Sequence, residues 1–355
     1  MKLDTAMAVP VVDARPLLSG DTASTDAALG AALAEAGGCV LVGLPHLGAA
    51  RSAIFSFFDQ PAEAKAAVAG QHQLWGYSGR PRRGWLAIES YNCGPPSLAA
   101  HPGTWEHGRR EFVPCRRADA DVHFLPNVWP AEPVLPGWRA AMEAQHAAFE
   151  RLGLVCVRSV ARWLGADEEA AAAPWADSLS TLRPISYRPP PPGWAPEPGD
   201  GIATLDDGRF VQFPEHRDNG TGLSLISSSA AGLQMQSPDG VWRDVPAVEG
   251  GVSVHAGKGL ELLSGGRLRA TPHRVLSSGG GRRSLSFFFC PHPSNQILPL
   301  AGRSPAETAA LEASAALASR RESHAEGWAV EAAAWPWWSS NSVSGYRAAQ
   351  PPPKL

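Results

Sequence analysis

Between residues 183 and 292 the chain is a series of short apolar runs separated by Gly, Pro or Asp. The runs are, in order, LRPISY, RFVQF, GLSLIS, GLQMQ, WRDV, GVSVHAG, RATPHRVL and RSLSFFF. Runs of this length, rich in β-branched and aromatic residues and bounded by turn residues, are typical of short strands. At this spacing they predict an antiparallel sandwich or barrel.

The segments on both sides of this β region predict helices and loops that wrap around it. Apolar periodicity or alanine content predicts helices at 21–36, 50–69, 137–165 and 304–333. Short strands are expected at 9–14 and 39–44. Residues 70–136 are rich in Gly, Pro, Arg and Trp and lack periodicity, so we expect long loops and short strands there.

These patterns predict four regions within one integrated structural domain. They are an N-terminal region of strands, helices and substrate loops (1–135), scaffold helices (136–182), a β catalytic core (183–295), and a C-terminal helix with a Trp- and Pro-rich tail (296–355).

The net charge limits the kinds of binding partner, and the cysteine content indicates the cellular compartment. A formal net charge of −3 provides no basic field for nucleic acid or an anionic membrane, so small-molecule partners are expected. The five cysteines are scattered and never spaced as CxxC, which argues against a disulfide framework and favours a reducing cytosol. Asp4 and Asp13 interrupt the apolar core that a signal peptide needs. We expect a cytoplasmic monomer or weak homo-oligomer.

His216 and Asp218 are the first candidate metal ligands. In a strand, residues i and i+2 point to the same face, so an imidazole and a carboxylate at this spacing can bind one ion. The pattern alone is weak, because 11 His and 34 acidic residues in 355 give about one His-x-acid pair by chance. A second pair, His324 and Glu326, lies in the 304–333 helical pattern, where i and i+2 diverge by about 200°. Only the His216 pair remains a candidate.

A third candidate ligand, His273, follows after several strand-like segments. Two histidines and one carboxylate form the facial triad of non-haem Fe(II) oxygenases, which leaves positions open for other ligands. Arg282 and Ser284 come nine and eleven residues later and share one face of a strand. Their guanidinium and hydroxyl groups suit a carboxylate.

The order of motifs along the chain resembles the isopenicillin N synthase-like group of 2-oxoglutarate- and Fe(II)-dependent dioxygenases. The N-terminal segments VPVVDARPLL, GGCVLVGLP and FFDQPAEAKAAVA are similar to the family's IPVIDL, GFFYVVGHG and FFxLPxExK. Residues 126–130 fit PNxWP. GLQMQSPDGVWRDVP resembles GLQVxxxDGxWIxVP, and RATPHRVLSSGGGRRSLSFFFCPHP resembles RATxHRVxxxxxxRxSxxFFxxP.

The resemblance implies a mainly β fold with α elements: a double-stranded β-helix (jelly-roll) core flanked by N- and C-terminal helices. It implies that His216, Asp218 and His273 hold Fe(II), and that Arg282 and Ser284 grip the far carboxylate of 2-oxoglutarate. Tyr187, in ISYRPP, resembles a family tyrosine near the co-substrate. The expected activity is oxidation of an unactivated C–H bond of a small molecule with O2, releasing succinate and CO2, by hydroxylation, desaturation or cyclisation.

Two alternatives remain open at this point. One is an isopenicillin N synthase-type oxidase, which uses Fe(II) and O2 without 2-oxoglutarate; the other is a non-catalytic β-helix binding protein. The chain departs from the family motifs in HRDNGTGLSLI, which has one extra residue, and at Lys258 and Arg188. Because Asp218 is present, a halogenase, which needs that position vacated, is not expected.

The substrate is the least constrained part of the prediction. Trp75, Trp85, Trp105, Trp335, Trp337 and Trp338 form either an aromatic lid or part of the packed shell. The run Arg80, Arg82 and Arg83 is expected in a solvated loop, with a substrate carboxylate or phosphate as the alternative. A role in specialised metabolism follows from family analogy alone.

Overall fold

The computed structural model describes residues 8–20, 22–44, 50–69, 75–82, 85–96, 127–176, 178–198, 200–218, 221–291, 297 and 299–300. Several sequence predictions concern residues outside these ranges and stay predictions: the helix at 304–333, the tail, Arg83, Pro126, Trp105, Trp335, Trp337 and Trp338.

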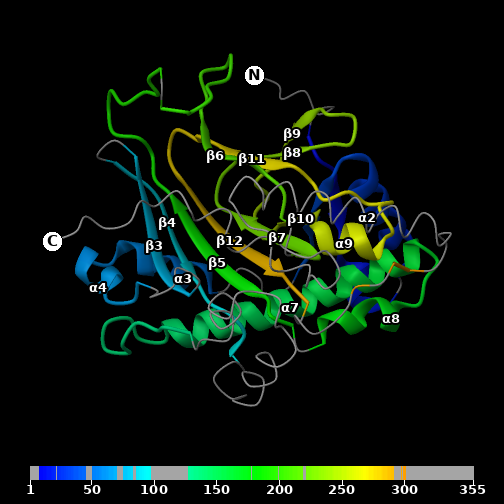
Figure 1. Cartoon of the computed structure of the whole chain (residues 1–355). Coiled ribbons are helices and arrows are strands. Elements are labelled where there is room, and N and C mark those ends of the chain that lie inside the picture. Colours follow the sequence, from blue (N-terminus) through cyan, green and yellow to red (C-terminus); the bar gives the residue numbers. More distant parts are fainter. Residues whose placement is uncertain are drawn as a thin grey trace, which may run out of the picture.

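Two β-sheets face each other and form the centre of the protein (Figure 1). The large sheet has the order β1 (Val11–Asp13), β2 (Gly38–Val42), β10 (Val252–Ala256), β7 (Leu223–Ser228), β12 (Arg282–Phe289), β5 (Thr181–Tyr187), β4 (Trp85–Asn92) and β3 (Gly76–Arg82). The small sheet has the order β6 (Val211–His216), β11 (His273–Leu276), β8 (Leu233–Gln236) and β9 (Trp242–Asp244). Neighbouring strands pair antiparallel, except the parallel pair β1 and β2.

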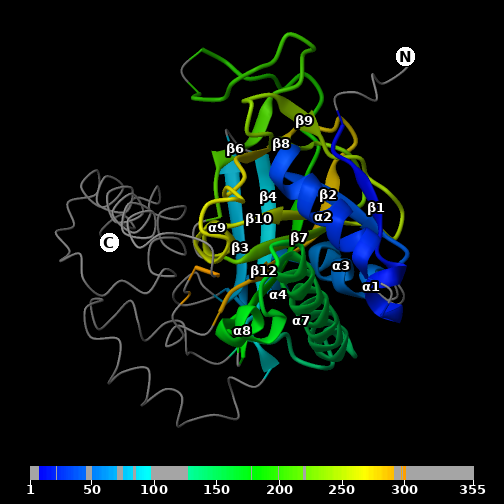
Figure 2. The ribbon, with the colours of Figure 1, turned by 90° about the vertical axis from the view of Figure 1, so that its right-hand side faces the viewer.

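Helices cover the outer face of the large sheet, as Figures 1 and 2 show for α2, α3 and α7. The helical elements are α1 (Arg15–Ser19), α2 (Ala23–Glu35), α3 (Arg51–Phe55), η2 (Ser56–Asp59), α4 (Ala62–Ala66), α7 (Trp138–Trp163), α8 (Glu168–Ala172), η5 (Ala173–Trp175) and α9 (Lys258–Leu263). No helix in the described ranges is long and apolar enough to cross a membrane.

The alternation of side chains along β12 separates two cores. Leu285, Phe287 and Phe289 point to the helices, while Arg282 and Ser284 point between the sheets. The core between the helices and the large sheet requires α7 to pack close to β12. A Cβ placed on Gly153 would lie 2.7 Å from the Phe289 ring, so this position must be glycine for the helix to pack as it does. The core between the sheets is smaller and includes Tyr187.

The strands expected between 183 and 292 are all present, and the predicted strands at 9–14 and 39–44 correspond to β1 and β2. The segment 50–69, predicted to be helical, is helical over most of its length but is divided into three short elements. Gln60, which precedes Pro61, is extended with φ −71° and ψ 155° and interrupts the helix, since a residue before proline disfavours the α region.

The described part of 70–136, where long loops and short strands were expected, contains strands. It contains β3 and β4, of seven and eight residues, which pair as a hairpin at the edge of the large sheet. Arg80 and Arg82 therefore lie in a strand and not in a loop, and Arg82 donates a hydrogen bond to the Gln212 carbonyl (3.0 Å).

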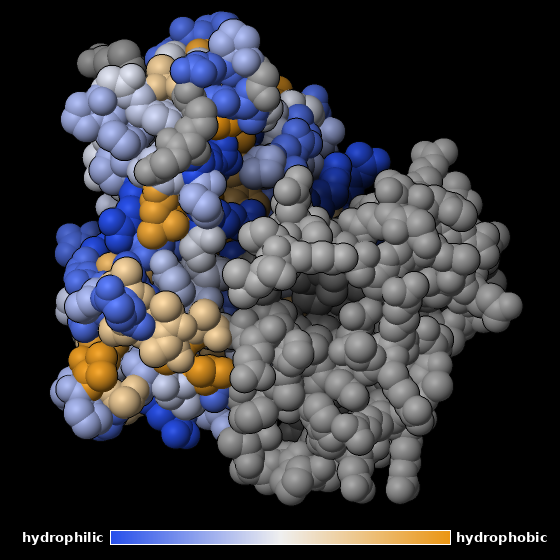
Figure 3. Space-filling model, turned by 60° about the vertical axis from the view of Figure 1, so that its left-hand side comes forward, coloured by the Kyte–Doolittle hydropathy of each residue, from blue (hydrophilic) through white to orange (hydrophobic). Residues whose placement is uncertain are grey.

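On the face shown in Figure 3, hydrophobic residues lie in small groups among hydrophilic ones over the described part of the surface.

The four-region division of the chain stays a prediction.

Candidate metal centre

His216, Asp218 and His273 lie together at one end of the space between the sheets. One nitrogen of each histidine and one carboxylate oxygen all lie within 4.8 Å of one another. His216 ends β6 and His273 begins β11, and the two residues are directly paired across these antiparallel strands. Their rings are 4.1 Å apart between centroids. Two ligands from paired strand ends and one from the following loop thus converge on a single point.

The convergence of His216 and Asp218 was expected, but the structural reason was wrong. β6 ends at His216, so Asp218 lies beyond the strand and strand alternation does not orient it. Its Oδ1 lies 3.7 Å from His216 Nε2, and its Oδ2 lies 3.6 Å from His273 Nε2.

Each histidine has the tautomer that a metal ligand needs. His216 Nδ1 lies 2.9 Å from the Pro214 carbonyl, and His273 Nδ1 lies 3.1 Å from the Thr271 carbonyl. Because a carbonyl only accepts, each Nδ1 carries the proton and each Nε2 directs a lone pair at the cluster.

The pKa values of the three side chains favour the protonation states that bind a cation. Burial, with the neighbouring His273, lowers the pKa of His216 to about 4. Burial likewise lowers the pKa of His273 to about 4. Burial alone would raise the pKa of Asp218, but His273 and the hydrogen bond from His255 hold it well below its ordinary value. Near neutral pH the site therefore has two neutral imidazoles and one carboxylate.

Arg282 and Ser284 lie side by side on the inner face of β12, as their spacing predicted. Both are almost fully buried. Arg282 donates a hydrogen bond to Ser228 Oγ and lies 5.2 Å above the Tyr187 ring. Arg282 Nε and Ser284 Oγ are buried and have no hydrogen-bond partner among the described residues. Buried polar atoms are rarely left unpaired, so this pair fits a carboxylate that binds between the sheets.

Tyr187 ends β5 and pairs with Arg282 across the strands. Burial raises its pKa, while the charges of Arg282, Arg183 and Arg80 oppose that rise. Its proximity to Arg282 is consistent with the predicted place near the co-substrate.

Two residues of the site were missed by sequence reasoning. His255, on β10, is fully buried, and its Nε2 lies 3.2 Å from Asp218 Oδ2. Ser224, on β7, donates to the same oxygen over 2.5 Å. In GVSVHAG, His255 alternates with apolar residues, a pattern that does not separate a solvated polar face from a buried one, and its contact with Asp218 depends on strand pairing.

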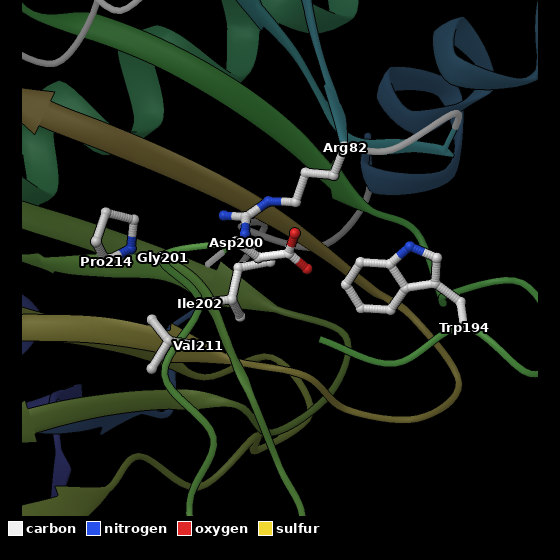
Figure 4. Close-up of a pocket in the computed structure, with 7 residues that line it drawn as sticks. All are labelled: Arg82, Trp194, Asp200, Gly201, Ile202, Val211 and Pro214. Atoms are coloured by element: carbon white, nitrogen blue, oxygen red, sulfur yellow. The ribbon is translucent and has the colours of Figure 1, made fainter. Parts of the chain in front are cut away.

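A pocket of about 360 Å³ lies beside β6 (Figure 4). It is lined by Arg82, Trp194, Asp200, Gly201, Ile202, Val211 and Pro214. In Figure 4 the Arg82 side chain reaches the pocket close to Asp200 in the view, and the Asp200 carboxylate is directed toward the side on which the Trp194 indole lies. Pro214 also accepts the hydrogen bond that orients His216, so the pocket adjoins the metal-ligand strand.

Of the tryptophans predicted to form either an aromatic lid or part of the packed shell, the two that the structure describes are packed. Trp75 and Trp85 are buried, and Trp85 packs on Trp194 with ring centroids 4.9 Å apart.

Comparison with known proteins shows which family and fold this chain is similar to. Residues 191–291 match the family model of the 2OG-Fe(II) oxygenase superfamily. Isopenicillin N synthase of Amycolatopsis lactamdurans is 32% identical over 58% of this chain and 58% of its own length. A 2-oxoglutarate-dependent dioxygenase of Gibberella zeae is 29% identical over 65% of this chain and 60% of its own. The matched region thus spans less than two thirds of these curated relatives.

Solved structures show the same fold. A full-length Neurospora crassa protein, solved in complex with alpha-KG, has a TM-score of 0.64 at 23% identity, covering 86% of this chain and 92% of that one. Dioxygenase for auxin oxidation 1 of Arabidopsis thaliana, a 2-oxoglutarate binary complex, has a TM-score of 0.59 at 16% identity, covering 84% and 97%. The double-stranded β-helix fold is confirmed, and the helices expected at its C-terminal end lie beyond the described residues. The β core, the curated relatives and the shared fold thus show similarity to the 2OG-Fe(II) oxygenase superfamily, the resemblance that the isopenicillin N synthase-like motifs indicated.

Proposed function

We propose that the protein is a 2-oxoglutarate- and Fe(II)-dependent dioxygenase that oxidises an unactivated C–H bond of a small molecule. The observation that carries the proposal is the presence of two complementary sites between the same two sheets, one on the small sheet and one on the large sheet. A His, Asp and His cluster can hold a metal, and a buried arginine and serine, each with a polar atom that no described residue bonds, can hold a carboxylate.

The donor set fits iron. Two imidazoles and one carboxylate on one side of an ion are the facial triad of non-haem Fe(II) oxygenases. His216, Asp218 and His273 would hold Fe(II), and Arg282 with Ser284 would hold the far carboxylate of 2-oxoglutarate. When bound, Fe(II), 2-oxoglutarate and O2 supply the oxidising chemistry and yield succinate and CO2.

The chain's own residues position the reactants. His216 and His273 are held by backbone carbonyls, so their Nε2 atoms stay directed at one point without reorganisation. Burial of Arg282 strengthens its attraction for an anion, because little solvent screens it. Whether hydroxylation, desaturation or cyclisation follows depends on which substrate carbon is held nearest the metal.

The test is an anaerobic titration of the protein with Fe(II) and then 2-oxoglutarate, followed by the weak visible charge-transfer band of the chelate. The band is expected with wild-type protein and absent in Asp218→Ala. Turnover assays should then show succinate formation in step with O2 uptake.

The same assays separate the alternatives. Several curated relatives are isopenicillin N synthases, and an oxidase of that type would consume O2 with its substrate in the absence of 2-oxoglutarate. A binding protein without catalytic function would give neither the chelate band nor O2 uptake.

A further inference from the structure

The position of Asp218 is not fixed by β6, the strand that precedes it. It lies two residues beyond the end of β6, in a loop. His216 and His273, in contrast, are fixed by direct pairing of β6 with β11. The position of the carboxylate therefore depends on contacts from other parts of the fold.

Those contacts come from β10 and the residues that follow it. The Lys258 amide donates to the Asp218 carbonyl over 2.9 Å, and the Gly259 amide donates to the Thr221 carbonyl over 2.8 Å. At Gly257, an added Cβ would lie 2.1 Å from Thr221 Oγ1 and 2.8 Å from the Asp218 carbonyl oxygen, so glycine permits the close approach. These contacts hold the backbone of the Asp218 loop.

His255 extends this support to the carboxylate. Its side chain is fully buried, and its Nε2 lies 3.2 Å from Asp218 Oδ2. An ionised carboxylate only accepts hydrogen bonds, so Nε2 carries the proton. The His255 ring also lies 4.3 Å from the His273 ring between centroids. His255 thus contacts one candidate ligand through a hydrogen bond and a second through its ring.

Ser224 completes the arrangement from the neighbouring strand. It pairs with His255 across β7 and β10, and its hydroxyl donates to the same oxygen, Asp218 Oδ2, over 2.5 Å. Two donors on Oδ2 fix the rotation of the carboxylate, with Oδ1 on the side of His216 Nε2.

We propose that His255 is a positioning residue, whose Nε2–H, together with the Ser224 hydroxyl, holds the Asp218 carboxylate in the orientation that binds the metal. The inference rests on the proposed function, because it assumes that Asp218 is a metal ligand. His255 itself supplies no ligand atom. Outer contacts of this kind commonly change metal affinity about 10- to 100-fold when they are removed.

The test compares two substitutions of similar size and shape. His255→Gln keeps an N–H donor at nearly the same distance along the side chain, whereas His255→Met removes it. Ser253→Ala is the matched control: Ser253 lies on the same face of β10 and is buried, but its hydroxyl donates to the Ile226 carbonyl and not to Asp218.

The readout is binding of Co(II) to the metal-free protein, followed by its visible absorption, which reports both affinity and coordination geometry. His255→Met should weaken Co(II) binding about 10- to 100-fold and alter the band shape. His255→Gln should restore affinity to within a few-fold of wild type, and Ser253→Ala should match wild type. Thermal unfolding of each metal-free protein separates loss of the site from loss of the fold.

Each outcome supports or overturns the role of His255 or the metal site itself. If His255→Met and His255→Gln bind Co(II) as wild type does, His255 does not position the ligand and the inference is overturned, while the metal site stands. If His255→Met does not fold, Ser224→Ala tests the same oxygen: weaker Co(II) binding supports the inference, and wild-type affinity overturns it. If wild-type protein binds Co(II) no better than Asp218→Ala, the proposed metal site itself fails.

Discussion

Arg282 and Arg283 are adjacent in sequence but lie on opposite faces of β12, so replacing each with leucine tests where 2-oxoglutarate binds. Arg282 is 3% exposed and points between the sheets. Arg283 points outward, bonds to Asp59 Oδ1 at 2.5 Å, and has a side chain that is 39% exposed. The substitutions are chemically identical, and only the face of the strand differs.

The expected effects differ by more than a factor of ten. Removing one partner of a buried charge-assisted pair costs about 2–5 kcal/mol, so about 3 kcal/mol corresponds to roughly 150-fold weaker 2-oxoglutarate binding by Arg282→Leu. Loss of an exposed ion pair costs about 0–1 kcal/mol of stability, and Arg283→Leu should leave 2-oxoglutarate affinity unchanged. Arg282→Lys should fall between the two, since it keeps the charge but loses the planar fork.

The assay is the anaerobic 2-oxoglutarate titration of the Fe(II)-loaded protein, with thermal unfolding of each variant as the control for folding. Equal affinities for the two leucine variants, or a larger loss in Arg283→Leu, would refute the assignment of the co-substrate carboxylate to the inner face of β12.

Further predictions concern the metal ligand, pH and packing. Asp218→Ala should abolish Fe(II)-dependent 2-oxoglutarate turnover, measured as succinate; undiminished turnover would remove Asp218 from the site. The pKa of His273 falls from 6.5 to about 4 on folding, so between these values the unfolded chain binds a proton that the folded protein does not. Stability of the metal-free protein should therefore decrease as pH falls through this window, by about 1 kcal/mol at pH 5.5 from this residue, and urea unfolding at pH 7.5 and 5.5 measures it. Gly153→Ala places a Cβ 2.7 Å from the Phe289 ring and should cost about 1–3 kcal/mol. Gly280→Ala meets no atom within 4 Å and should be near neutral in the same unfolding assay.

The strands of the β core were predictable because their signal is local. Alternation in RRSLSFFF placed Arg282 and Ser284 on one face, and the structure shows that face between the sheets. Short strand-like runs with turn residues between them were sufficient to predict an antiparallel β fold, and the order of motifs was sufficient to indicate the family.

Other features differed from the expectations for local or tertiary reasons. The helical segment 50–69 is interrupted at Gln60, because the residue before a proline disfavours the α region. The hairpin of β3 and β4 has little sequence periodicity, because its strands mix polar and apolar residues on both faces. Asp218 was expected to share a strand face with His216 but lies beyond the strand end.

The sequence by itself determined the candidate ligands, their order, and the arginine and serine that follow them. These depend on residue type, on spacing along a strand and on the order of motifs along the chain. Only the tertiary structure decided how Asp218 is held. His255 and Ser224 reach its carboxylate through the pairing of β10 with β7. Strand pairing brings together residues that are distant in the chain, and no sequence periodicity reveals which residues will meet. The pairing is set by the packing of whole strands between the two cores.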